Sequence, residues 1–157
     1  MKKAVIDLGT NTFNLLIADT ADDSLHIIFQ TKAAVLLGMG GINDGIIADD
    51  AMERALSALT RFTKITEEYG IQTKDIRAIG TSAMRAASNA DAFSELVANT
   101  FEIKIDIITG LEEAKLIYQG VKWSYDFSSP AVIMDIGGGS SEFIYATKMG
   151  VTDMVSF

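Results

Sequence analysis

Two stretches decide the fold, Ala4-Val5-Ile6-Asp7-Leu8-Gly9 and Val132-Ile133-Met134-Asp135-Ile136-Gly137, which share one pattern. They align without gaps at an offset of 128 residues, from position 4 to position 132. In each, a short apolar run ends in Asp-x-Gly, small polar residues follow, and a second apolar run begins. The same offset places residues 14–18 over 142–146 and Phe29 over Phe157. This pattern predicts an internal duplication of a strand–turn–strand unit.

Between the two copies, the apolar periodicity predicts an α/β domain made of layers. Apolar segments with turn-like separators predict a three-stranded meander first, followed by a glycine-rich loop at residues 38–45 and then alternating helices and strands. Asp50 with Glu53, and Thr109 with Glu112, have the spacing of helix-capping pairs. The predicted strands are 4–8, 13–19, 25–35, 76–80 and 103–109, and the predicted helices are 50–69, 89–100 and 111–123.

The loop at residues 123–130 holds the only proline, Pro130, and has the character of a domain boundary. The sequence therefore predicts a first domain at residues 1–126 and the opening strands of a second, similar domain at residues 127–157. Three strands without a covering layer leave an apolar face exposed. We expect the chain to be the amino-terminal piece of a longer protein.

Composition limits the classes of function. The chain has 157 residues, 48% of them hydrophobic, and a formal net charge of −8. An acidic chain is a poor candidate for binding nucleic acid or an anionic membrane, because both repel it. With no cysteine, the chain has no thiol nucleophile and no cysteine-ligated metal, and His26 as the single histidine rules out a two-histidine metal site.

The amino terminus does not have the pattern of a secretory signal. The sequence Met-Lys-Lys is followed by only three apolar residues before Asp7, too few for a signal-peptide core. No apolar run approaches the roughly 18 residues of a membrane-spanning helix. We expect a cytoplasmic protein that does not associate with membranes.

The two Asp-x-Gly loops carry the chemistry. Their sequences are Asp7-Leu8-Gly9-Thr10-Asn11-Thr12 and Asp135-Ile136-Gly137-Gly138-Gly139-Ser140-Ser141. Glycine lets the backbone approach a ligand, backbone amides and hydroxyls can donate to phosphate oxygens, and an aspartate can hold a hydrated cation. Either loop alone could be an ordinary hairpin turn. Two matched loops on repeated lobes favour a clamp on a phosphate chain.

Two further motifs follow, Gly80-Thr81-Ser82-Ala83-Met84-Arg85-Ala86-Ala87-Ser88-Asn89 and Thr109-Gly110-Leu111-Glu112-Glu113-Ala114-Lys115-Leu116-Ile117-Tyr118-Gln119-Gly120-Val121. With the two loops, they resemble the exopolyphosphatase and guanosine pentaphosphate phosphatase family of the actin, Hsp70 and sugar-kinase superfamily. All four motifs occur in family order and cover nearly the whole chain. The resemblance implies a ribonuclease H-like, actin-type ATPase domain and a second domain that continues far beyond Phe157.

Glu113 is the candidate catalytic base. Glu112 and Glu113 lie about 100° apart on a helix and cannot share one role. Glu112 falls at the third helical position and serves the cap, whereas Glu113 has Leu116 and Ile117 on its face. Partial desolvation there would raise the pKa of the Glu113 carboxyl, and the resemblance implies the same assignment. The alternative is a solvated carboxylate stabilised by the helix dipole.

The remaining site residues are assigned by the resemblance. Asp135 is implied to hold magnesium, or another divalent cation, through water or phosphate oxygens, with Glu142 assisting and Asp7 facing it from the other lobe. The alternatives are a surface arginine at Arg85 and a solvated strand residue at Glu142. The implied phosphate-binding residues are Gly9, Thr10, Asn11, Thr12, Arg85, Gly137, Gly138, Gly139 and Ser140.

The leading hypothesis is a magnesium-dependent phosphoanhydride hydrolase that releases terminal phosphate from polyphosphate or guanosine pentaphosphate. We expect the piece itself to be nearly inactive, and the resemblance leaves a homodimer of the full-length protein open. Family members commonly carry a basic residue where Asn14 stands and often an arginine where Leu36 stands, so two cations are absent here. The alternatives are an actin-like or sugar-kinase-like ATP-binding module and a family member that binds phosphate chains without hydrolysis.

Overall fold

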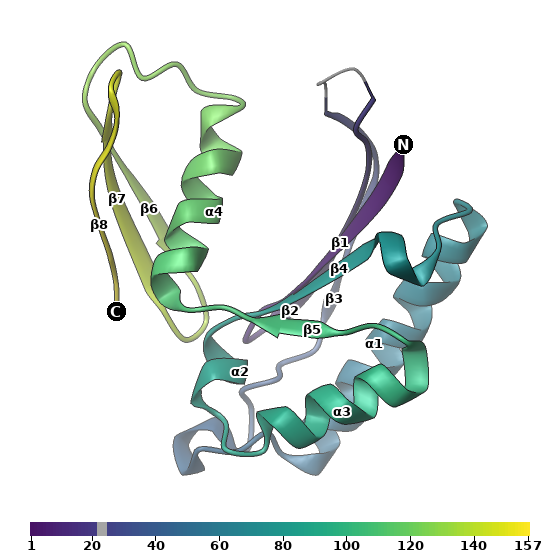
Figure 1. Cartoon of the computed structure of the whole chain (residues 1–157). Coiled ribbons are helices and arrows are strands. Elements are labelled where there is room, and N and C mark those ends of the chain that lie inside the picture. The colour runs from purple at the N-terminus through teal and green to yellow at the C-terminus, as the bar shows by residue number, and fades with distance from the viewer. Residues whose placement is uncertain (22–24) are drawn as a thin grey trace. The chain divides into compact units, whose positions relative to one another are not determined.

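Two separate sheets carry the strands, one of five strands in Met1–Ile107 and one of three in Ile108–Phe157 (Figure 1). The computed structural model describes residues 1–21 and 25–157. These two compact units divide the chain between Ile107 and Ile108, whereas the predicted domain boundary falls after residue 126. The difference arises because the last helix packs on the second sheet. The assignment of residues 1–126 and 127–157 to two domains stays a prediction.

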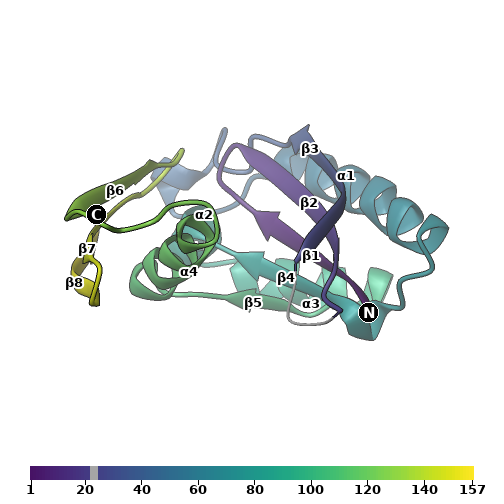
Figure 2. The same cartoon turned by 90° about the horizontal axis from the view of Figure 1, so that it is seen from above.

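The first sheet has the order β3-β2-β1-β4-β5, which Figure 2 shows from above. β1 pairs antiparallel with β2 and parallel with β4, so the predicted meander continues into a parallel half. The carboxyl ends of β1 and β4 therefore meet at one edge, where open α/β sheets bind ligands. The strands are β1 (Lys2–Leu8), β2 (Thr12–Asp19), β3 (His26–Ala34), β4 (Ile76–Gly80) and β5 (Ile105–Ile107).

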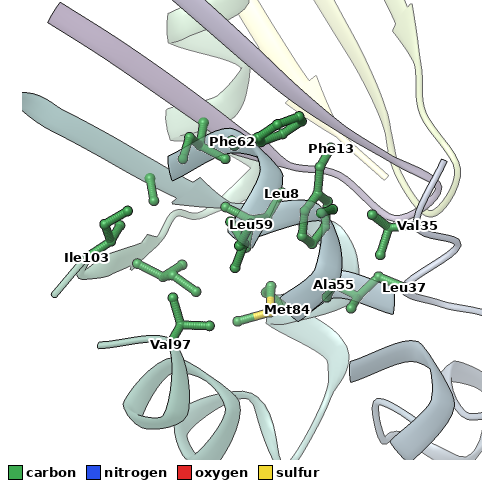
Figure 3. Packing of buried hydrophobic residues seen from close by; sticks show 14 of the residues in the cluster. Leu8, Phe13, Val35, Leu37, Ala55, Leu59, Phe62, Met84, Val97 and Ile103 are labelled. Atoms are coloured by element: carbon green, nitrogen blue, oxygen red, sulfur yellow. The ribbon is translucent and has the colours of Figure 1, made fainter. Parts of the chain in front are cut away.

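One face of this sheet forms the core with three helices. Alternate residues of β1 and β2 are buried there, and α1 and α3 contact each other. Figure 3 shows Leu59 and Phe62 of α1 packed with Phe13 of β2. The opposite face carries the outward residues of the same strands, among them Asp7 and Asn14. The helices are α1 (Asp49–Glu68), α2 (Ser82–Ala86) and α3 (Ala90–Phe101), with short 3-10 turns η1 (Ile42–Asp44) and η2 (Thr73–Asp75).

The second unit is a three-stranded antiparallel meander with one helix. Its strands are β6 (Ala131–Ile136), β7 (Ser141–Thr147) and β8 (Gly150–Ser156), and helix α4 (Gly110–Lys122) contacts β7 and β8. Ile144 and Ala146 of β7 are buried, at 0% exposure each. In Figure 1 the amino-terminal turn of α4 lies at the same end of this sheet as the β6–β7 loop.

The duplication extends to the hydrogen-bond register. Asp7 pairs with Asn14, and Asp135 pairs with Glu142, which are the same positions shifted by 128. Both meanders also carry a register shift at the same place, between Ile17 and Ala18 in one and between Tyr145 and Ala146 in the other. The two meanders are therefore copies at the level of individual pairs.

The predicted equivalence of Phe29 and Phe157 is wrong. The turn between Thr147 and Gly150 holds two residues, whereas six separate Asp19 from His26. Beyond this turn the offset falls from 128 to 124, as the pairs Asn14–Lys32 and Glu142–Ser156 show.

The order of strands and long helices is confirmed, with two corrections. The Asp50–Glu53 cap is wrong because α1 begins one residue earlier, with Ala48 as its N-cap and no capping side chain. Asp50 instead accepts a hydrogen bond from Arg54 one turn later, at 2.6 Å. The strand predicted at 103–109 is limited to Ile105–Ile107.

None of the helices in the described part of the chain has both the length and the apolar character to cross a membrane.

Candidate active-site halves

The first half of the site lies where β1 turns into β2. Asp7 points to the outward face of the sheet, and its Oδ2 accepts a hydrogen bond from Nδ2 of Asn14 across the strand pair, at 3.0 Å. Gly9 opens the turn. A Cβ at Gly9 would lie 2.8 Å from the backbone oxygen of Thr12, so the turn has no room for a larger residue. The loop is thus a tight turn beside a carboxylate.

Segment 35–38 anchors this loop from the side. The backbone amides of Val35 and Leu36 both donate to the carbonyl oxygen of Asn11, at 3.0 and 2.8 Å, and the amide of Gly38 donates to that of Thr10. Arg54 of α1 binds the carbonyls of Val35 and Leu36 at 2.7 and 3.1 Å. Leu36 has a φ of 53°, a conformation that leucine rarely adopts. Segment 35–38 thus links the loop to helix α1, because it donates hydrogen bonds to the loop and accepts hydrogen bonds from Arg54 of the helix.

Arg85 belongs to the same unit. The residue before α2, Thr81, donates from its backbone amide to the carbonyl oxygen of Leu8, at 3.4 Å. This bond places the start of α2 beside the end of β1. Arg85 lies in the last turn of α2 and is half-buried, which differs from a fully exposed surface arginine.

The second half of the site repeats the first. Asp135 and Glu142 face each other across β6 and β7, and the loop at residues 137–140 joins the strands. Gly137 donates its amide to the carbonyl of Ser140 at 2.9 Å, and a Cβ at Gly137 would lie 3.3 Å from that oxygen. This turn is tight in the same sense as the first, with slightly more room.

Glu142 is a buried carboxylate. Its exposure is 1%, which contradicts the solvated-strand alternative, and its Oε1 accepts a hydrogen bond from Oγ of Ser156 at 2.8 Å. Two carboxylates directly opposite each other on one face repel. No lysine or arginine in residues 1–21 and 25–157 forms an ion pair with Asp135 or Glu142, so a cation between them would relieve the repulsion.

Helix α4 presents Glu112 and Glu113 in different environments. The Thr109 side chain accepts from the amide of Glu112, and the amide and hydroxyl of Thr109 donate to Oε2 of Glu112, which completes the predicted capping box. These bonds from Thr109 lower the pKa of the Glu112 carboxyl below its ordinary value. Glu113 is half-buried, in agreement with the partial desolvation expected from Leu116 and Ile117 on its face.

The capping box predicts a pH-dependent contribution to stability. Because the pKa of Glu112 is lowered in the folded state, its stabilisation is complete above the ordinary value of 4.5 and is lost as the pH falls through the lowered pKa. Thermal unfolding of wild type and Glu112→Gln at pH 7 and pH 3 measures it. We expect wild type to have the higher Tm at pH 7 and the gap to shrink at pH 3. An unchanged gap would contradict the role of the ionised cap.

The predicted site residues fall into these two sets, each held together within its own unit. Asp7, the loop 9–12 and Arg85 belong to Met1–Ile107, and Glu113, Asp135, the loop 137–140 and Glu142 belong to Ile108–Phe157. Within the described residues, no three acidic or histidine side chains gather closely enough to hold a metal ion by themselves. Two carboxylates with substrate phosphates and water are, however, the usual protein environment of magnesium.

Sequence reasoning missed three residues of these halves. They are Lys32, which pairs with Asn14, Ser156, which binds Glu142, and Arg54, which holds segment 35–36. Alternation along β3 could have placed Lys32 on the outward face, but its partner depends on the length of the preceding turn.

The chain is similar in sequence and in fold to known phosphatases. The model of the Ppx/GppA phosphatase family matches residues 16–157. An exopolyphosphatase crystal structure from Cytophaga hutchinsonii is 40% identical, with a TM-score of 0.95, over 100% of this chain and 50% of that one. An Aquifex aeolicus Ppx/GppA family structure is 28% identical, with a TM-score of 0.85, over 100% of this chain and 51% of that one. These two similarities identify the fold as the actin-like ATPase type.

Two curated relatives are also similar. A guanosine-5'-triphosphate,3'-diphosphate pyrophosphatase of Photobacterium profundum is 36% identical over 98% of this chain and 30% of its own length. A bifunctional 3-dehydroquinate synthase/phosphatase of Fusobacterium nucleatum is 35% identical over 98% of this chain and 24% of its own. The chain thus spans less than a third of these curated relatives and about half of the solved structures.

Proposed function

Because this chain belongs to the Ppx/GppA phosphatase family, we propose that the protein hydrolyses phosphoanhydride bonds and releases terminal phosphate from inorganic polyphosphate or guanosine pentaphosphate. The printed functions of its relatives, an exopolyphosphatase and a guanosine-5'-triphosphate,3'-diphosphate pyrophosphatase, support both substrates.

One observation carries the proposal. Two glycine turns, each following an aspartate in the same register, occur on two copies of one meander. A single tight turn is common in hairpins, but a pair with matched carboxylates gives each unit its own set of backbone donors for phosphate oxygens. Arg85, on the helix α2 that starts beside the end of β1, adds a guanidinium, which suits phosphate oxygens.

The proposed roles follow from the chemistry of the groups. Glu113 accepts a proton from the attacking water, since a half-buried carboxylate makes a better base than a solvated one. The turns at residues 9–12 and 137–140, with Arg85, bind the phosphoryl oxygens on which charge develops. Glu112 is engaged by the cap and holds the first turn of α4 in place.

Magnesium is part of this proposal. Asp135 and the buried Glu142 form an opposed pair of oxygen donors without a basic partner among the described residues, which fits a divalent cation. Asp7 is the corresponding carboxylate of the first copy. A bound magnesium ion would neutralise charge on the phosphoryl oxygens.

A substrate panel on the intact protein tests the proposal. Phosphate release is measured from polyphosphate, guanosine pentaphosphate and ATP, each with magnesium and with excess EDTA. We expect release from at least one of the first two, abolished by EDTA and restored by magnesium. Turnover of ATP alone would favour the nucleotide-binding alternative, and release that persists in EDTA would refute the metal assignment.

A further inference from the structure

Three side chains form a row across the outward face of the first sheet. Asp7 of β1 lies opposite Asn14 of β2, and Asn14 lies opposite Lys32 of β3. The other face is occupied by the core, so the row faces away from α1. The amide of Asn14 donates to Asp7, and Lys32 stands on the other side of Asn14. The row therefore runs from a negative through a neutral to a positive group.

A hollow of about 630 Å³ lies along this row. Its floor includes the apolar residues Val5 and Leu16, and its polar residues include all three members of the row. Lys32 is the one lysine or arginine among the described residues that line it. Lys32 is an exposed residue and makes no ion pair with an acidic side chain in residues 1–21 and 25–157. The hollow thus has a single cation available to a ligand.

The duplicated meander shows that the fold does not require a cation at the position of Lys32, because the equivalent residue of the second copy is Ser156. The equivalent row in the second unit is Asp135, Glu142 and Ser156. There the third position is a hydroxyl that bonds to the second, at 2.8 Å. The same framework therefore holds two carboxylates in one copy and a separated carboxylate and ammonium in the other.

The spacing of the row sets the kind of ligand. Neighbouring strands lie about 4.8 Å apart, so Asp7 and Lys32, two strands apart, are separated by about 10 Å at the backbone. The hollow extends from Asp7 past Lys32 to Gln30, so an anion that fills it is longer than a single phosphate group. A ligand that starts at the turn after Asp7 and also meets Lys32 along the hollow must carry charge along its length.

We propose that Lys32 binds the phosphates of the substrate that follow the reacting one, and so makes affinity depend on chain length. This inference rests on the proposed function and adds to it a subsite and a preference for extended phosphate chains over short ones. Lys32 is a binding residue in this account, not a catalytic one. Its removal should therefore weaken binding and leave the chemical step unchanged.

The test compares three variants of the intact protein. Lys32→Gln removes the charge, Lys32→Arg keeps it, and Lys64→Gln removes an exposed lysine from α1 on the other side of the sheet. Binding of pyrophosphate and of long-chain polyphosphate is measured by calorimetry, with kcat and KM for phosphate release from polyphosphate beside it.

We expect Lys32→Gln to raise the Kd for long-chain polyphosphate about tenfold, as loss of a charge-assisted hydrogen bond does. The Kd for pyrophosphate and the kcat should stay within about twofold of wild type, with Lys32→Arg and Lys64→Gln close to wild type. Equal weakening for short and long chains, or none, overturns the subsite while the hydrolase proposal stands. If wild type binds polyphosphate yet hydrolyses no phosphoanhydride, the proposed function fails, and the Kd values still decide the subsite. If wild type binds no polyphosphate, the subsite proposal fails, whereas the proposed function still stands if guanosine pentaphosphate is hydrolysed.

Discussion

Glu113→Gln in the intact protein is expected to lower kcat for phosphate release at least 100-fold, since a general base contributes about 10²–10⁴-fold to a rate. The substitution keeps the size of a half-buried side chain but removes its ability to accept a proton. Substrate Kd should change by less than about threefold, because the base acts on water and not on the phosphate chain. Single-turnover kinetics beside a binding measurement separate the two effects.

The neighbouring residue provides the matched control. Glu112→Gln makes the same chemical change one position earlier, in a side chain whose oxygens are bound by Thr109. We expect it to cost some thermal stability and to leave kcat within about threefold of wild type. If Glu113→Gln also stayed within threefold, Glu113 would not be the base, and equal losses in both variants would indicate damage to the first turn of α4.

Gly9→Ala is expected to lower kcat/KM about 100-fold, the loss that a displacement of about 1 Å in a site can cause. The added Cβ would lie 2.8 Å from the carbonyl oxygen of Thr12, closer than such atoms approach, so the turn must open. Opening moves the backbone donors of residues 9–12 and disturbs the end of the β1–β2 pair. Activity and thermal unfolding are measured together, to separate a displaced turn from an unfolded domain.

Substitutions at two other glycines, Gly137 and Gly120, serve as controls for the effect of Gly9→Ala. At Gly137 the corresponding Cβ would lie 3.3 Å from the Ser140 oxygen, so Gly137→Ala should cost less activity than Gly9→Ala. At Gly120, within α4, a Cβ would meet no atom within 4 Å other than those of its chain neighbours and of the backbone of its own helix. Gly120→Ala should keep full activity and gain about 1 kcal/mol of stability, because alanine favours a helix over glycine. Wild-type activity in Gly9→Ala would show that the turn tolerates a shift, and it would contradict the assignment of residues 9–12 to the active site.

Local patterns predicted the parts of the fold that depend on neighbours in sequence. Thr109 and Glu112 form the capping box that their spacing indicates, because a cap involves residues three apart. The offset of 128 likewise aligned Asp135 with Asp7 and Glu142 with Asn14, and the structure pairs these residues in the same register in both hairpins, since their first turns are of equal length.

Features that depend on distant segments were outside the reach of sequence patterns. The equivalence of Phe29 and Phe157 failed because the second turn of one meander is shorter than that of the other. For the same reason neither Lys32 nor Ser156 could be placed in a row. The burial of Glu142 follows from the packing of α4 on β7, which alternation along one strand does not reveal.

The shared register of the two meanders makes the rows Asp7–Asn14–Lys32 and Asp135–Glu142–Ser156 equivalent in their backbone positions, although α4 covers the face of the second row. A side chain can be transplanted from one copy to the other by adding 128 before the second turn and 124 after it, with its backbone setting unchanged. Chimaeras that carry Ser at position 32 or Lys at position 156 would therefore move a single charge between two scaffolds of the same geometry. Such swaps would show directly how the functions of the two copies of the duplicated hairpin unit differ.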